Sequence, residues 1–133
     1  MKIDKEDQKL LALWAADCAE RVLPYFEKEY PKDKRPRKAI EACREWVRTG
    51  VFKMAEVRKA ALDAHTAARD SKVPAATFAA RAAGQAASVP HVAGHALGVP
   101  YYVSKALGEG WEKEKKWELS HLPKHLHSFV FQE

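Results

Sequence analysis

The chain is 133 residues long, enough for one domain with a sizeable hydrophobic core. Its 47% hydrophobic and 31% charged residues are the proportions of an ordinary soluble globular protein, and no apolar run is long enough to cross a membrane. The net charge of +5 comes from segments that mix both signs, so we interpret it first as a solvated surface. The charged start, MKIDKEDQK, has no secretory h-region, and we expect a cytoplasmic protein with Cys18 and Cys43 reduced.

Apolar residues at helical spacing predict three helices in the first half of the chain. The first is expected over residues 6–29, where Pro24 either kinks the last turns or starts a new helical segment. A proline in the first turn and a glycine at the end bound the second helix, 36–50. The third is expected over residues 54–70, with a buried face made mostly of alanine.

The segment that follows is expected to form the centre of the fold. Between Lys72 and Lys105 the only permanently charged residue is Arg81, and alanine is abundant. We predict a fourth helix over 74–88 and a fifth over 90–107, which Pro100 should kink unless a helix begins afresh there. Four small residues are expected at close helix contacts: Ala79, Ala83, Ala86 and Gly94.

The end of the chain predicts a short, highly charged sixth helix over 111–119 and a tail over 120–133. No strand-length alternation with hairpin turns occurs anywhere. We therefore predict an all-α fold, a compact single-domain helical bundle of about five to six helices, with its core in residues 6–119.

Three histidines are the candidate metal ligands. His91 and His95 are four residues apart on the predicted fifth helix and should share a face, and His65 on the third helix would complete a set for zinc or iron. The spacing lacks the glutamate of an HExxH metalloprotease. The alternative, which we favour, is that both histidines pack through hydrogen bonds beside Gly94 and Gly98, so no cofactor is expected.

Polar residues on or beside apolar faces predict a buried network linking the first, third and fourth helices. Asp17 is expected to pair with one of the arginines of this set, and a structural role is favoured over an active site. No phosphate loop, nucleophile elbow or triad order is present, so no catalytic residue is predicted. The expected network is Asp17, Arg21, His65, Arg69 and Arg81.

A basic run between the first two helices is a candidate contact patch for phosphates or for an acidic protein. No aromatic residues alternate with these cations to stack bases, and no helix-turn-helix pattern precedes them. A solvated loop is therefore the favoured interpretation. The patch consists of Lys32, Lys34, Arg35, Arg37 and Lys38.

The order and spacing of several segments over residues 7–127 resemble the Imm-5-like family of putative immunity proteins. These segments are ALWAADCAERVLPYFE, RPRKAIEACREWVRTG, AEVRKAALDAHTAARDS, ARAAGQAASVPHVAGHALGVPYYVSKAL and WELSHLP. The resemblance implies an α-helical bacterial or archaeal protein that is an antidote to a polymorphic toxin. It implies no catalytic residue.

The leading hypothesis is therefore a non-enzymatic protein that binds and neutralises a toxin. One alternative is a metal-dependent helical-bundle enzyme using His65, His91 and His95, and another is a nucleic-acid-associated protein using the basic run 32–38. We expect a toxin partner, no membrane and no nucleic acid, and a homo-oligomer stays open.

Overall fold

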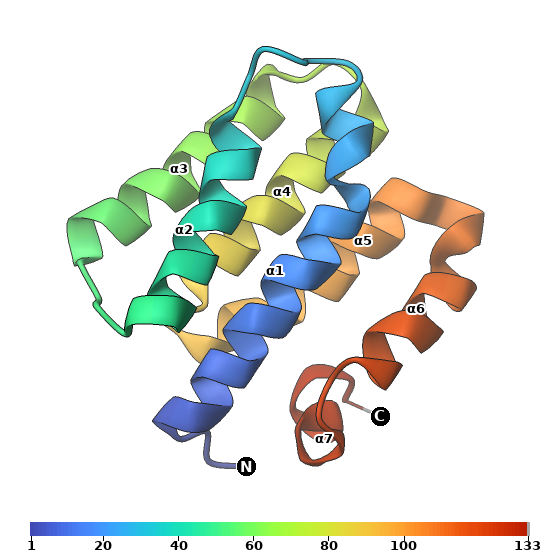
Figure 1. Ribbon diagram of the computed structural model, residues 1–133. Helices are drawn as coiled ribbons and strands as arrows, with labels where there is room; N and C mark the ends of the chain where they lie inside the picture. The colour runs from blue at the N-terminus through green and yellow to red at the C-terminus, as the bar shows by residue number, and fades with distance from the viewer. Residues whose placement is uncertain (133) are drawn as a thin grey trace.

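The structure is a computed structural model that describes residues 1–132 of the chain (Figure 1). In that range it has seven α-helices and no strand. Six have ten or more residues, and the last has four. The all-α prediction is confirmed. The helices are α1 (Lys5–Glu27), α2 (Arg35–Thr49), α3 (Met54–Asp70), α4 (Pro74–Ser88), α5 (Gly98–Leu107), α6 (Trp111–Ser120) and α7 (His127–Val130).

Local sequence signals set the helix ends. The Asp4 side chain accepts a hydrogen bond from the Asp7 amide at 2.8 Å and closes a capping box at the start of α1. α2 has Pro36 in its first turn and ends at Gly50, which has a left-handed backbone with φ of 71°. Pro24 lies inside α1, so the helix continues through it to Glu27.

The central helix of the bundle is α4, with α1 and α2 in front of it in Figure 1. Every buried residue of α4 is alanine or glycine, including Ala79, Ala83 and Ala86 as predicted. Such small side chains let the neighbouring helices approach closely. Larger core side chains come from the surrounding helices, among them Leu11, Leu23, Phe26, Ile40, Val99 and Val103.

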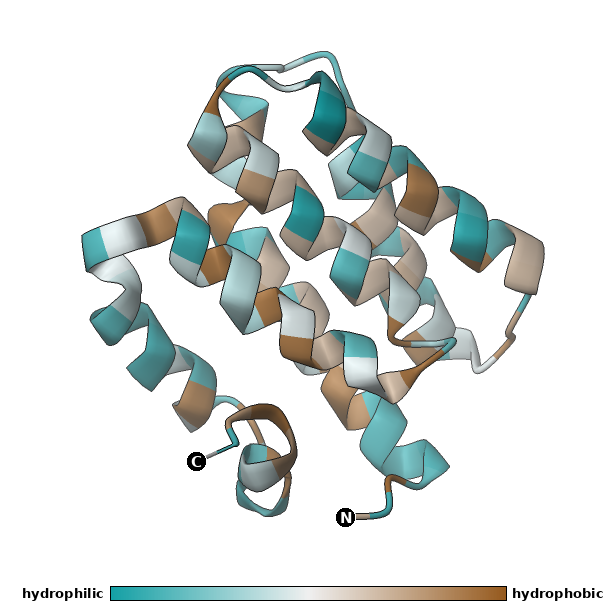
Figure 2. Ribbon diagram, turned by 180° about the vertical axis from the view of Figure 1, so that it is seen from behind, coloured by the Kyte–Doolittle hydropathy of each residue, from teal (hydrophilic) through white to brown (hydrophobic). Residues whose placement is uncertain are grey.

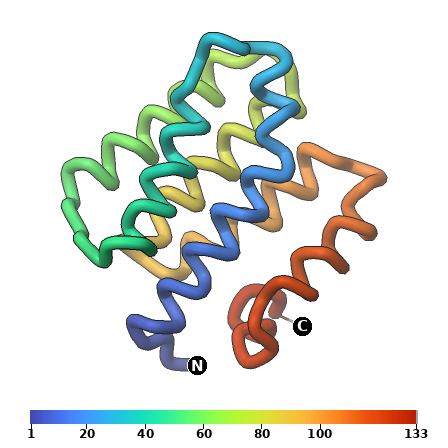
Figure 3. Tube along the Cα trace, in the orientation of Figure 1, coloured from blue at the N-terminus to red at the C-terminus, as the bar shows by residue number. Residues whose placement is uncertain are grey.

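The C-terminal segment folds back along α1 and ends at the same end of the molecule as the N-terminus (Figure 3). Trp14 of α1 donates through Nε1 to the Glu118 carbonyl of α6 at 2.8 Å. The residues after α6 bury three further apolar side chains: Leu122, Leu126 and Val130. None of the helices in residues 1–132 has both the length and the apolarity to cross a bilayer.

The predicted fifth helix, 90–107, is wrong in its first half. Residues 93–97 form a 3₁₀ helix, and α5 begins afresh at Gly98. Pro100 therefore lies in the first turn of α5, where a missing amide N–H costs no intrahelical bond, and no kink is needed.

The close contact predicted at Gly94 is also wrong, because this glycine is exposed and a Cβ there would meet only Val92 at 3.9 Å. The tight glycine contacts are at Gly84 and Gly98 instead.

Candidate functional site

A partly exposed stripe of α4 lies between α3 and α5 on the side of the bundle away from α1 and α2 (Figure 2). The stripe carries Phe78, Arg81 and Gln85, which are spaced three and four residues apart and are each half-buried. Because the other residues in the middle of α4, 79–80, 82–84 and 86–87, are buried, this is the side on which the central helix meets solvent. All of its polar groups here bond to α3 or to the segment before α5.

On the α3 side, His65 is held by Arg81. Arg81 donates through Nη1 to His65 Nδ1 at 3.0 Å, so Nδ1 is the acceptor and the imidazole is neutral. Burial, with the positive charge of Arg81 as the next cause, lowers the pKa of His65 to about 4. A Cβ at Gly84 would lie 2.6 Å from His65 Nε2, so the ring occupies space that only glycine leaves free.

On the α5 side, Gln85 makes the matching contact. His95 donates through Nδ1 to Gln85 Oε1 at 3.0 Å, and burial lowers the pKa of His95. A Cβ at Gly98 would lie 2.8 Å from Gln85 Cδ. The missing Cβ atoms of Gly84 and Gly98 therefore leave room for the His65 and Gln85 side chains at the contacts of α4 with α3 and α5.

Aromatic rings continue this surface onto α5. Phe78 stacks against Tyr102 with centroids 6.3 Å apart, and Tyr101 meets Tyr102 edge-on at 5.1 Å. Lys105 places Nζ 5.5 Å from the centre of the Tyr101 ring. Tyr101 is 55% exposed, so the aromatic cluster reaches solvent.

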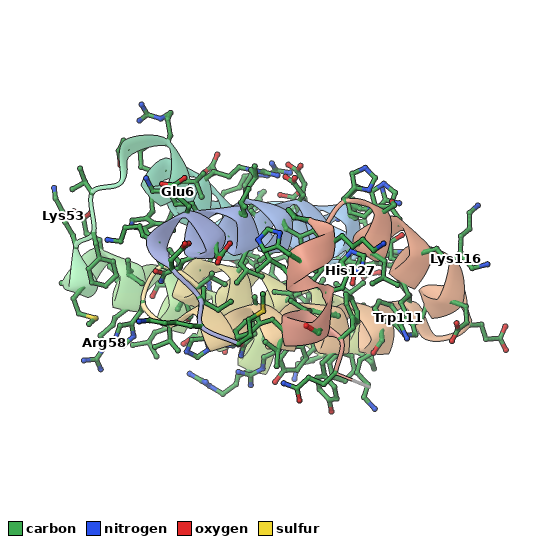
Figure 4. All side chains as sticks on the ribbon, turned by 90° about the horizontal axis from the view of Figure 1, so that it is seen from below. Glu6, Lys53, Arg58, Trp111, Lys116 and His127 are labelled. Carbon is green, nitrogen blue, oxygen red and sulfur yellow. The ribbon has the colours of Figure 1, made fainter. Side chains whose placement is uncertain are left out.

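We call this surface the rear face. On α3 it includes the stripe shared by Arg58, Leu62, His65 and Arg69, which recur at helical spacing, and Leu62 is 55% exposed. Figure 4 shows Arg58 on the opposite side of the bundle from Glu6 of α1. The rear face is defined by Arg58, Leu62, Arg69, Phe78, Arg81 and Tyr101.

The eight arginines of the chain divide between the two sides of the bundle. Those of α1 and α2 are all ion-paired: Arg21 with Glu114, Arg35 with Asp33 and Asp70, Arg37 with Glu27, Arg44 with Asp17 and Glu20, and Arg48 with Glu45. Those of α3 and α4 have no carboxylate at ion-pair distance within residues 1–132: Arg58, Arg69 and Arg81.

The three histidines predicted to bind a metal do not converge. His91 lies exposed in the turn after α4 and stacks on Phe52, with centroids 6.2 Å apart. The prediction that His91 and His95 share a helix face fails because no α-helix connects them. Over the part of the chain that the structure describes, no three His, Cys, Asp or Glu side chains are grouped to hold a metal ion.

The predicted five-residue buried network is wrong as a unit. Asp17 is 43% exposed and pairs with Arg44 at 2.8 Å, a cation outside the predicted set. Arg21 pairs with Glu114 of α6 and lies over the Trp117 ring. Arg69 donates to Thr66 on its own helix, so the predicted residues contribute only the contact between His65 and Arg81.

The basic run is partly neutralised. Arg35 bonds to Asp33 at 2.7 Å and to Asp70 at 3.1 Å, and Arg37 bonds to Glu27 at 2.6 Å. The remaining cations, Lys32, Lys34 and Lys38, are exposed. Two of the five predicted contact residues therefore fasten the loop and the start of α2 to neighbouring helices.

One buried acid was missed by the sequence analysis. The Glu118 side chain of α6 is fully buried, and within residues 1–132 neither carboxylate oxygen meets the geometry of a hydrogen bond, although the Cys18 thiol lies close enough to stabilise the charged form. Burial, followed by the charge of Glu114, raises the pKa of Glu118 to about 8. The available signal was its position seven residues after Trp111, which places both on the same helix face.

A comparison with protein families gives one match. The model of the family described as Imm-5 like putative immunity protein matches residues 1–125. Neither a curated protein nor a solved structure matches the chain.

Proposed function

The chain belongs to the Imm-5 like putative immunity protein family, whose model matches nearly its whole length, and we propose that it neutralises a toxin by binding it. Family membership is the observation that carries this proposal. An immunity protein implies a toxin as partner, and direct binding is the simplest way for a domain of 133 residues to block one.

The surface chemistry supports binding without catalysis. A general base works best with a pKa near the operating pH, and His65, with a pKa of about 4, is a weak base at neutral pH. His65 and His95 also each use Nδ1 in a contact within the protein. Glu118, whose pKa does lie near neutrality, is fully buried and has no access to a substrate.

The size of the molecule also permits direct inhibition. A stable protein–protein interface covers about 800 Å² of each partner. That is about a tenth of the 7436 Å² surface of this chain. No observation favours the metal-enzyme alternative at His65, His91 and His95 or the nucleic-acid alternative at residues 32–38.

The first step of the test is to express the neighbouring genes one at a time and find one whose product arrests growth. That product is the candidate toxin. Co-expression of the present chain should restore growth, and the two purified proteins should form a complex. Toxin activity should fall in proportion to the amount of chain added and vanish at a fixed stoichiometry. Complete inhibition at a molar ratio of chain to toxin far below one would show that the chain acts as an enzyme and would contradict the proposal. A lasting change in the mass of the toxin would do the same.

A further inference from the structure

We propose that the rear face is the toxin-binding surface and that the part of the toxin it contacts is acidic. This inference rests on the proposed function and adds the location and the charge of the interface. It starts from the division of the arginines, because the three that have no carboxylate partner among residues 1–132 all lie on α3 and α4.

The unpaired guanidinium groups keep most of their hydrogen-bonding capacity. A guanidinium has five N–H donors in a planar fork that matches a carboxylate. Arg69 uses one contact to Thr66, and Arg81 uses one contact to His65, which is a neutral acceptor. Their positive charge is therefore not compensated by these contacts.

The acids nearest to the rear face are directed to other cations. Residues 71–108 contain no Asp or Glu, so α4 and α5 contribute positive charge only. On α3, Asp63 bonds to Lys59 at 2.6 Å and Asp70 to Arg35 at 3.1 Å. The third acid, Glu56, lies 4.0 Å from Lys53. A partner surface of negative charge would be complementary to this arrangement.

The apolar part of the rear face favours a protein partner over a nucleic acid. Exposed Leu62 lies on the same stripe of α3 as Arg58 and Arg69, and exposed Tyr101 lies beside Lys105. Aromatic residues and arginine are enriched at protein interfaces. Single-stranded nucleic acids instead stack their bases on free ring faces. Here Phe78 and Tyr102 are stacked against each other, and Lys105 lies near the Tyr101 ring.

The test uses the full chain, labelled with ¹⁵N, and two polyanions at equal charge concentration in low salt: poly-L-glutamate and polyuridylate RNA. Poly-L-glutamate should shift the Nε–Hε signals of Arg58, Arg69 and Arg81 and the amide signals of the outward stripes of α3 and α4. The shifts should weaken as salt is added. Shifts concentrated on Lys32, Lys34 and Lys38 would overturn the inference, and so would tighter binding of polyuridylate to the rear face.

Matched variants separate the contribution of the rear face to binding from that of the net charge of the chain. The double variant Arg58→Gln/Arg69→Gln should bind poly-L-glutamate about fivefold more weakly, the loss expected for two exposed ion pairs. The control Arg37→Gln/Arg48→Gln removes the same charge from paired arginines of α2 and should bind as the unmodified chain does. Equal losses in both double variants would show a general charge effect and overturn the inference.

The result is independent of the growth test. If poly-L-glutamate binds the rear face but no toxin is neutralised, the proposed function fails while the acidic-ligand surface stands. If a toxin is neutralised equally well by the Arg58→Gln/Arg69→Gln variant, the proposed function stands and the location of the interface is wrong.

Discussion

The buried carboxyl of Glu118 makes a quantitative prediction about stability and pH. Its ordinary pKa of 4.5 is raised to about 8 in the folded protein, so between these values the folded state holds a proton that the unfolded state releases. The free energy of unfolding must therefore fall as pH rises through this window. The change Glu118→Gln leaves a neutral side chain of similar shape at every pH.

The magnitude follows from the size of the shift. One pKa unit corresponds to about 1.36 kcal/mol, so ionising Glu118 in the folded state costs on the order of 5 kcal/mol. Relative to the unmodified chain, Glu118→Gln should gain about 4 kcal/mol of unfolding free energy between pH 5 and pH 9. The charged or titratable groups acting on Glu118 are Cys18, Arg21 and Glu114. Burial raises the pKa of Cys18, which keeps its thiol neutral across this range.

Urea unfolding followed by tryptophan fluorescence, at pH 5, 7 and 9, measures this difference. The control is Glu112→Gln, which makes the same chemical change at an exposed position of α6 and should leave the pH dependence unaltered. Parallel pH profiles for Glu118→Gln and the unmodified chain would refute the reasoning. A Glu118 carboxyl carbon that titrates near pH 4.5 by NMR would refute it as well.

Three further predictions concern the packing and pairing of other groups. Gly84→Ala should lower the free energy of unfolding by about 1–3 kcal/mol in a urea titration because its Cβ would overlap His65, whereas Gly94→Ala should have little effect; equal losses would contradict the assigned contacts. By NMR, His65 should gain its proton only near pH 4, and because the unfolded histidine gains one near 6.5, this residue should make the protein less stable as pH falls through that interval; a His65 titration at 6.5 would argue against its burial. Asp17→Asn should change the unfolding free energy by less than about 1 kcal/mol, since its pair with Arg44 is partly exposed, and a larger loss would mean that the carboxylate is buried.

The helices were largely predictable because their signals are local. Pro36, Gly50 and Pro74 act on the backbone of their own segments, and five of the six longer helices lie within two residues of their predicted bounds. The start of the fifth helix was not predictable, because Pro90 can begin a helix or lie in a turn. Which of these occurs depends on where α4 and α5 meet, and Gly98 marks that place by admitting Gln85.

The side-chain partners were less predictable because they depend on which helices are neighbours. Asp17 lies on α1 as predicted, but it is partly exposed rather than buried and its partner comes from α2, and Arg21 pairs with α6, nearly a hundred residues along the chain. The burial of Glu118 likewise depends on α6 lying against α1. Helical periodicity gives the direction of a side chain on its own helix and says nothing about what lies opposite.

The packing of α4 through alanine and glycine has a consequence for how this protein can change over generations. Buried alanine loses no rotamer freedom on folding, so the helix packs at low entropic cost, but a larger side chain at Ala79 or Ala83 would push neighbouring helices apart. Arg58, Leu62 and Arg69 on the outward stripe of α3 escape most of that constraint because their side chains are exposed. On the proposed function, this exposed stripe can change with an altering toxin while the interior of the bundle stays fixed, so that new specificities arise without a new fold.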